Sequence, residues 1–203
     1  SFRMKKVMSL KGLLGLAEDL INQNKESLHS SEDYLTHLKT TYEVGRGVCE
    51  QILFNYNFLD DYICKDEVSL ACGLHDIGRP LRKNQLFHEL RGAEYIEKKG
   101  LSLGVANNNV DVFRIAQMFR PHFIVYEQFL DKKNSEESKV FSKIDPVLLI
   151  PRTWQEGIVL YSDLSNLSGE FIDYNERIND IKKRYSPGTK WYESNKSLAD
   201  SLD

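Results

Sequence analysis

Apolar residues recur at intervals of three and four through most of the chain, the spacing of an amphipathic α-helix. The first such run comprises Leu10, Leu13, Leu14, Ala17, Leu20 and Ile21. A longer run, from about 34 to 54, follows the helix-capping residues Ser30, Ser31 and Asp33. His37 lies in the early turns of this second predicted helix.

A third helix is predicted from about 66 to 74, because Gly78 and Pro80 disfavour its continuation. The adjacent residues His75 and Asp76 are therefore expected at a helix end. Further helices are predicted over about 88–99, 110–118, 154–164 and 174–185. His122 follows Pro121, just beyond the second of these.

The polar stretch 131–143 predicts a surface loop that acts as a lid or simply as a connector. We recognise no strand pair with turn chemistry, no internal repeat and no shift in composition that marks a second domain. The pattern indicates an all-α fold, with one domain over residues 1–203. Its helical core is expected over about 30–186, and a weak tail helix over about 187–203.

Composition narrows the classes of function. The 203 residues carry a formal net charge of −3, which argues against a broad nucleic-acid-binding surface and leaves room only for a local phosphate site. Three cysteines without a Cys-x-x-Cys pair predict free thiols in a reducing, cytoplasmic compartment. No run approaches the roughly 20 apolar residues of a membrane span, so no membrane partner is expected.

The chemistry-bearing residues are histidines and aspartates at long-range spacing. Imidazole and carboxylate groups bind first-row divalent ions, and a helical bundle can direct several of them inward from different helices. The candidate residues in chain order are His37, His75, Asp76, His88, His122 and Asp163, and a metal centre built from such residues is physically feasible. His29 is interpreted as a solvated loop residue, and Cys72 as an inert thiol on an apolar helix.

The segment from Leu70 to Pro80 reads Leu-Ala-Cys-Gly-Leu-His-Asp-Ile-Gly-Arg-Pro and resembles the HD-domain metal-dependent phosphohydrolases. The resemblance extends over about 34–185. It includes the His-x-x-x-Gly-Ala pattern that begins at His88, and the late helix that carries Asp163. It implies an HD-domain helical bundle in which His37, His75, Asp76 and Asp163 bind a divalent ion.

The resemblance leaves the number of ions open. With two ions, Asp76 bridges them and His88 and His122 bind the second; with one, these histidines hydrogen-bond the phosphate or relay a proton. The metal also stays open among Mn, Fe, Co, Ni, Zn and Mg. His75, Asp76, His88 and His122 are the predicted catalytic residues. The predicted phosphate-binding residues, each close in sequence to a ligand, are Arg79, Arg91 and Arg120.

The function that this resemblance implies is hydrolysis of a phosphoester or phosphoanhydride bond in a small phosphorylated substrate, of the nucleotide type. Phosphomonoesterase, phosphodiesterase and pyrophosphohydrolase activities are not resolved. The alternative is a nucleotide-sensing module that binds without turnover. Retention of every ligand position favours the enzyme, and the oligomeric state is left open.

Overall fold

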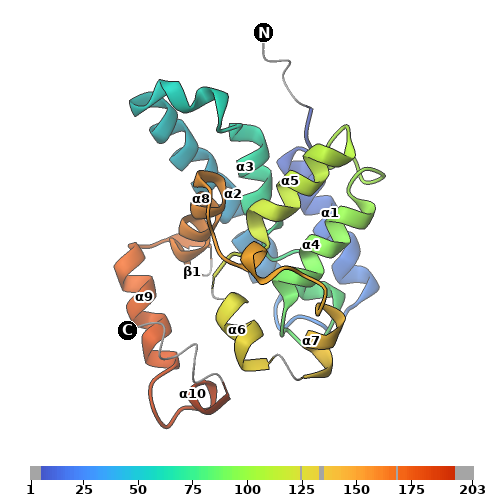
Figure 1. Ribbon diagram of the computed structural model, residues 1–203, viewed down its shortest axis with the longest axis vertical. Helices are drawn as coiled ribbons and strands as arrows, with labels where there is room; N and C mark the ends of the chain where they lie inside the picture. Colours follow the sequence, from blue (N-terminus) through green and yellow to red (C-terminus); the bar gives the residue numbers. More distant parts are fainter. Residues whose placement is uncertain (1–5, 124, 133–134, 168, 195–203) are drawn as a thin grey trace.

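The computed structural model describes residues 6–123, 125–132, 135–167 and 169–194 (Figure 1). Within these residues the secondary structure is almost entirely helical, which confirms the all-α prediction. In chain order the elements are α1 (Leu10–Gln23), α2 (Ser31–Asn55), η1 (Asn57–Asp61), α3 (Lys65–Leu74), η2 (Arg79–Leu81), α4 (His88–Lys99), α5 (Asn109–Phe119), α6 (Val125–Lys132), α7 (Glu136–Val140), η3 (Pro146–Leu149), α8 (Trp154–Leu164), β1 (Asn166–Leu167), β2 (Glu170–Phe171), α9 (Tyr174–Arg184) and α10 (Lys190–Ser194).

Capping side chains set the starts of several helices. Ser9, Ser30 and Asn108 each accept a hydrogen bond from a backbone N–H in the first turn of α1, α2 and α5 respectively. At α8, Thr153 and Glu156 form a reciprocal capping box. These local signals explain why the helix boundaries lie close to those predicted from the sequence.

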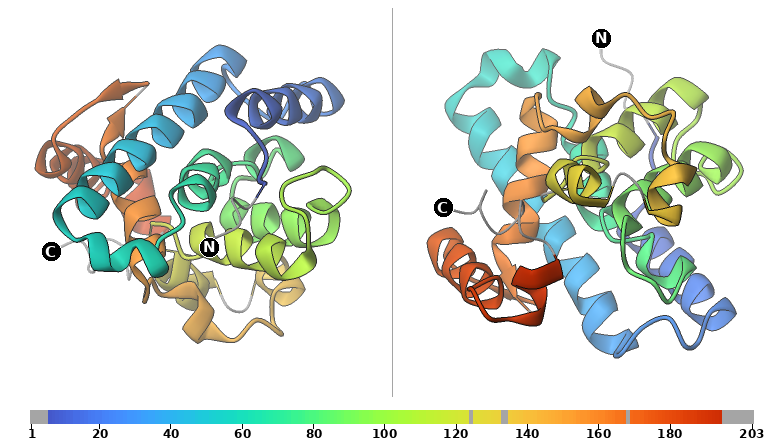
Figure 2. Two further views of the ribbon diagram at one scale, coloured as in Figure 1. Left: turned by 90° about the horizontal axis from the view of Figure 1, so that it is seen from above. Right: turned by 60° about the horizontal axis from the view of Figure 1, so that its bottom comes forward.

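Helix α3 is the centre of the bundle. Its residues from Glu67 to Leu74 are all buried, and α1, α2, α5 and α8 surround it (Figures 1 and 2). The closest pairing is with α2, because Gly45 leaves no side chain between the two helices. A Cβ at Gly45 would lie only 2.3 Å from Sγ of Cys72. This close packing brings the second turn of α2 to the C-terminal end of α3.

The hydrophobic core begins earlier in the chain than the predicted 30–186. Leu13 and Ala17 of α1 are fully buried and belong to the same apolar cluster as α3 and α5. Docking on α3 removes the apolar face of α1 from water, which is why the helix joins the core.

A second apolar cluster lies under the segment predicted to be a loop. It consists of Phe87, Leu90, Val125, Phe141 and Leu149, which join α4, α6, α7 and η3. The prediction of an irregular loop over 131–143 was therefore wrong for residues 131 and 132, which end α6, and for Glu136–Val140, which forms α7. Ser135 caps this single turn and Phe141 anchors it, so its polar residues can face water. Residues 133 and 134 lie outside the described residues.

A short antiparallel hairpin corrects the expectation that no strands are present. β1 pairs with β2 through Asn166 opposite Phe171 and Leu167 opposite Glu170. Two-residue strands contain too few positions to show an alternating pattern, which is why the sequence did not indicate them.

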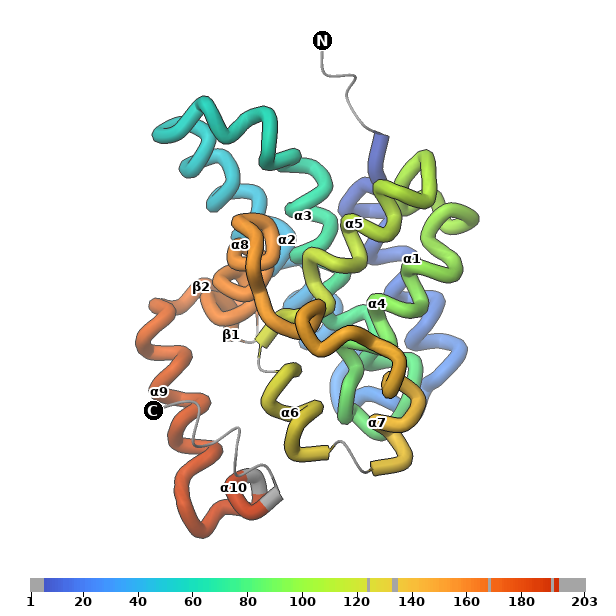
Figure 3. Tube along the Cα trace, viewed as in Figure 1, coloured from blue at the N-terminus to red at the C-terminus, as the bar shows by residue number. Residues whose placement is uncertain are grey.

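The last helices of the described residues lie at the edge of the bundle. Helix α9 packs against α8, and α9 and α10 lie on the outer side of the molecule (Figure 3). Residues 190–194 of the predicted tail helix are helical as α10, and 195–203 lie outside the described residues. Across the described part of the chain, no helix combines the length and apolarity needed to cross a membrane.

Candidate metal centre

Six predicted ligands meet at one place in the bundle, where five helices present their ends or early turns. His37 is on the second turn of α2, His75 is the residue that caps the C-terminus of α3, and Asp76 follows it. The others are His88 at the start of α4, His122 just after α5, and Asp163 in the last turn of α8. The C-terminal ends of α3, α5 and α8 favour a cation there, because helix C-termini carry partial negative charge.

The first group of donor atoms comes from α2, α3 and α8. Nε2 of His37 lies 3.0 Å from Nε2 of His75, and Oδ1 of Asp163 lies 3.3 Å from both nitrogens. Oδ2 of Asp76 completes this group at 3.7 Å from His37 and 3.6 Å from His75. Three side chains of this group, those of His37, His75 and Asp163, have the mutual spacing of a metal site.

The second group uses the other oxygen of Asp76. Oδ1 of Asp76 lies 2.8 Å from Nε2 of His88 and 3.6 Å from Nε2 of His122. His75, Asp76 and His122 are also close enough together to share one ion. The carboxylate of Asp76 thus lies between two sets of imidazoles, one oxygen toward each.

These spacings fit a first-row ion without rearrangement. Two ligand atoms that are each about 2.1 Å from an ion lie about 3.0 Å apart at a right angle and about 3.4 Å apart at the tetrahedral angle. The contacts of the first group among His37, His75 and Asp163 are 3.0 and 3.3 Å. The donor spacing is therefore that of ligands around a single cation.

Backbone carbonyls determine which imidazole nitrogens face the centre. Nδ1 of His75 lies 2.7 Å from the carbonyl oxygen of Cys72, and Nδ1 of His122 lies 2.6 Å from the carbonyl oxygen of Phe119. Nδ1 of His88 lies 2.9 Å from the carbonyl oxygen of Gln85.

A carbonyl oxygen only accepts, so each of these Nδ1 atoms must carry the proton. In its uncharged form, each of these imidazoles presents an Nε2 lone pair to the centre, as metal-binding histidines do. Together with the two carboxylates, the Nε2 atoms of His75, His88 and His122 could hold a cation.

The carboxylates are held in the charged form that binds metal. Burial raises the pKa of Asp76, but the guanidinium of Arg79 and the imidazoles of His75 and His88 outweigh it, so this pKa lies well below its usual range. Burial likewise raises the pKa of Asp163, and His75 and His37 hold it well below the usual range. Burial lowers the pKa of His37, whereas Asp163 and Asp76 raise it to a net value above 6.5. In the absence of an ion, the centre therefore attracts a proton instead.

Part of the centre is exposed to solvent. The side chains of His37 and Asp163 are 19% and 17% exposed, whereas that of His75 is fully buried. Solvent therefore reaches the first group at His37 and Asp163.

Buried polar residues outside the ligand set hold the centre in place. Asn166 of the hairpin donates through Nδ2 to the carbonyl oxygen of His37 at 3.0 Å and to Oγ1 of Thr41 at 2.8 Å. The hydroxyl of Tyr34 donates to the carbonyl oxygen of Asp76 at 3.1 Å. Sequence reasoning missed these residues, because an ordinary Asn, Thr or Tyr on a helix or loop carries no signal of its own.

Two strained aromatic residues flank the histidines of the second group. Phe87 precedes His88 and Phe123 follows His122, and both have left-handed backbone angles, with φ of 59° and 56°. Bulky side chains rarely adopt this region, and such outliers concentrate at functional sites. The fully buried Phe87 is held by ring contacts with Phe129 and Phe141.

The three predicted phosphate-binding arginines lie in different environments. Nε of Arg79 donates to Oδ2 of Asp76 at 2.5 Å, and its side chain is 38% exposed, so it borders the centre and reaches solvent. Arg91 instead donates to the carbonyl oxygens of Leu86 and Asn84. Its role in phosphate binding stays a prediction.

Arg120 is largely buried and its hydrogen bonds run away from the ligand set. Its guanidinium donates to Glu97 and Gln117. Among the described residues, Arg79 is thus the only predicted phosphate-binding arginine with a hydrogen bond to a residue of the centre.

A buried acidic residue near the centre was also not predicted. Glu89 is almost fully buried, and its Oε1 lies 3.5 Å from Nε2 of His88. With His88 and His122 it forms a further group that has metal-site spacing. Its position directly after His88 was the only signal, and adjacent residues on a helix normally point in different directions.

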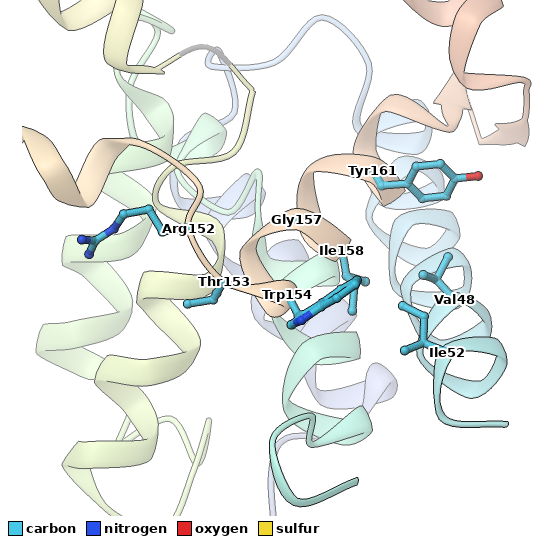
Figure 4. A pocket seen from close by; sticks show the side chains of 8 residues that line it. All are labelled: Val48, Ile52, Arg152, Thr153, Trp154, Gly157, Ile158 and Tyr161. Atoms are coloured by element: carbon cyan, nitrogen blue, oxygen red, sulfur yellow. The ribbon is translucent and has the colours of Figure 1, made fainter. Parts of the chain in front are cut away.

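A separate hollow of 440 Å³ lies between α2 and the start of α8. Figure 4 shows Trp154, Ile158, Val48 and Ile52 along it. Trp154 begins α8 and Asp163 is nearly at its end, about 13 Å further along the helix axis. This apolar hollow is thus distinct from the metal centre.

Comparisons of the chain with known protein families, with curated proteins and with solved structures found no match.

Proposed function

We propose that this protein is a metal-dependent phosphohydrolase of the HD-domain type. It would hydrolyse a phosphoester or phosphoanhydride bond in a small phosphorylated substrate, of the nucleotide type. The observation that carries the proposal is the position of Asp76. Its Oδ2 faces His37 and His75, while its Oδ1 faces His88 and His122.

The ligand chemistry favours first-row transition ions over Mg²⁺. Four imidazoles surround Asp76, whereas Mg²⁺ prefers oxygen ligands and retained waters. Divalent ions held here would supply Lewis acidity, which lowers the pKa of water and neutralises charge on a phosphoryl group.

The chain's own residues have separate tasks in this proposal. The imidazoles of His75, His88 and His122 are oriented by carbonyl oxygens, so their Nε2 atoms need no reorganisation before binding. Arg79 carries a permanent positive charge at the exposed edge of the centre and is the residue best placed to bind phosphate oxygens. His37 and Asp163 border the solvent side through which the substrate enters.

The test combines metal analysis with a panel of phosphomonoester, phosphodiester and nucleoside polyphosphate substrates. Wild-type protein should retain first-row metal and hydrolyse at least one substrate class. Asp76→Ala should lose both properties and keep its helical circular dichroism spectrum, because an anionic ligand is removed. Asp19→Ala, an exposed aspartate on α1, is the matched control and should behave as wild type.

Two results would count against the proposal. Full activity of Asp76→Ala at matched metal content would refute the mechanism. Tight nucleotide binding by metal-loaded wild-type protein without turnover would favour the nucleotide-sensing alternative.

A further inference from the structure

Glu89 is a buried carboxylate whose contacts within the fold leave one oxygen without a partner. It occupies the first turn of α4 directly after His88, and it is 1% exposed. Its Oε1 approaches Nε2 of His88 at 3.5 Å, and its Oε2 is buried without a hydrogen-bond partner among the described residues. Burying a charged carboxylate without compensation is costly, so the carboxylate of Glu89 requires a counter-charge.

The nearby guanidinium groups make their hydrogen bonds elsewhere. Arg79 directs Nε to Asp76, and Arg91 donates to the carbonyl oxygens of Leu86 and Asn84. Neither forms an ion pair with Glu89 among the described contacts. Both guanidinium groups attract Glu89 electrostatically, but neither donates a hydrogen bond to it, so its Oε2 is left without a hydrogen-bond partner among the described residues.

The surroundings of Glu89 are those of a cation ligand. Donor atoms of His88, Glu89 and His122 all lie within 4.8 Å of one another, and the three residues are buried. The backbone explains how two adjacent residues reach one place. His88 is the first residue of α4, where the chain enters from the left-handed Phe87, so His88 and Glu89 are not constrained by a preceding helical turn.

We propose that Glu89 is a ligand of a second divalent cation, together with His88, His122 and Oδ1 of Asp76. This inference rests on the proposed function and deepens it. With Glu89 as a ligand, the two ion positions have the same ligand types. Each position has two imidazoles, one carboxylate of its own, and one oxygen of the shared Asp76. Asp163 is the separate carboxylate of the first position, and Glu89 is that of the second.

The experiment measures bound metal in wild type, Glu89→Gln and the control Glu94→Gln after equilibration with Mn²⁺ or Co²⁺. Glutamine preserves the volume of the side chain and removes its charge. Glu94 is on the same helix, and its partly exposed carboxylate pairs with Lys98. Wild type and Glu94→Gln should bind two ions per chain, and Glu89→Gln should bind one.

The affinity of the second ion provides the quantitative measure. Loss of even an outer hydrogen-bond partner lowers metal affinity about 10–100-fold, so loss of a ligand should lower it by at least about 100-fold. Unchanged stoichiometry and affinity in Glu89→Gln would overturn the inference. If Glu89→Gln does not fold, Glu89→Asp is the second test, because it keeps the charge but shortens the side chain. This variant should still bind the second ion more weakly than wild type. Unchanged binding of the second ion in Glu89→Asp would equally overturn the inference.

Thermal unfolding separates a ligand from a merely structural residue. In the presence of a chelator, Glu89→Gln should unfold at the wild-type temperature or above it, because a buried charge has been removed. Added metal should then raise its unfolding temperature less than it raises that of wild type. A single ion in wild type would sink this inference and leave the proposed hydrolysis intact, whereas no bound ion at all would sink the proposed function.

Discussion

Gly78→Ala should disrupt the second group of donor atoms although it replaces none of the candidate ligands. Gly78 lies two residues after Asp76 and has ordinary right-handed backbone angles, so its conformation does not require glycine. The requirement is space, because the turn after the His-Asp pair packs directly on the first turns of α4. A Cβ at Gly78 would lie 1.9 Å from the carbonyl oxygen of His88 and 2.7 Å from the amide nitrogen of Gly92.

The size of the effect follows from these distances. Cβ atoms essentially never approach another heavy atom within 3.0 Å, so the turn and α4 must separate by about 1 Å. Both neighbours are backbone atoms, which cannot move aside as a flexible side chain would. Overpacking of this kind costs about 1–3 kcal/mol. For a chain of this length, each kcal/mol lowers the unfolding temperature by about 2–4 °C.

The same displacement should weaken ion binding. Metal–ligand distances tolerate changes of only about 0.2 Å, and His88 moves with the first turn of α4. We therefore expect Gly78→Ala to lose the second ion before the first, as measured by metal analysis and calorimetric titration.

Gly47→Ala is the matched control for this substitution. Gly47 lies inside α2, where a Cβ meets nothing within 4 Å. Replacing a helical glycine by alanine should stabilise the protein by about 0.5–1 kcal/mol. The two glycine variants should thus shift the unfolding temperature in opposite directions. A Gly78→Ala protein as stable as wild type and with full metal content would refute the packing argument.

Three further predictions concern the surroundings of the centre. Asn166→Ala removes two buried hydrogen bonds that hold the turn of His37, so the free energy of unfolding should fall by about 1–3 kcal/mol in urea titrations. Arg79→Ala should keep its metal but lose about ten- to hundredfold in kcat/KM, and Arg79→Lys should restore part of that loss. A change in kcat/KM below about twofold for Arg79→Ala would show that Arg79 does not bind the substrate. Arg91→Ala should chiefly lower the unfolding temperature. Acid should destabilise the metal-free protein, because the lowered pKa of Asp163 contributes stability that is present above its unfolded value of 3.8 and is lost as the pH falls through the folded pKa. The raised pKa of His37 acts oppositely: its contribution is present below 6.5 and is lost as the pH rises through the folded pKa, while protonation of His37 weakens ion binding at low pH. Chelator-treated protein unfolded across the pH range, and metal titrations at the same pH values, measure both effects.

The helices themselves were largely determined by local sequence. Ser30 and Thr153 cap helices near the predicted starts, and the third predicted helix ends at Leu74, before the turn at Gly78. Such signals act between residues a few positions apart, so they can be recognised without knowing the fold. The position of the His-Asp pair at a helix end followed from them.

The distances between residues that are far apart in the sequence depend on tertiary packing. The sequence identified His37 and Asp163 as candidates, but only the packing of α2 and α8 around α3 brings their side chains to 3.3 Å. The orientation of Asp76, with one oxygen toward each pair of imidazoles, likewise follows from the assembled bundle. No local pattern specifies such a geometry, because it depends on helix contacts across long stretches of chain.

The tertiary structure also decided which polar residues are free to act. Arg79, Arg91 and Arg120 look alike in the sequence, yet among the described contacts only that of Arg79 reaches the candidate centre. Arg91 binds backbone carbonyls, and Arg120 binds the partly buried carboxylate of Glu97. Glu89 looks like an ordinary residue of a helix and is instead buried beside His88. Residue type determines what chemistry a side chain can perform, but burial and the presence or absence of a partner decide whether it is available. Those two properties exist only once the helices have packed.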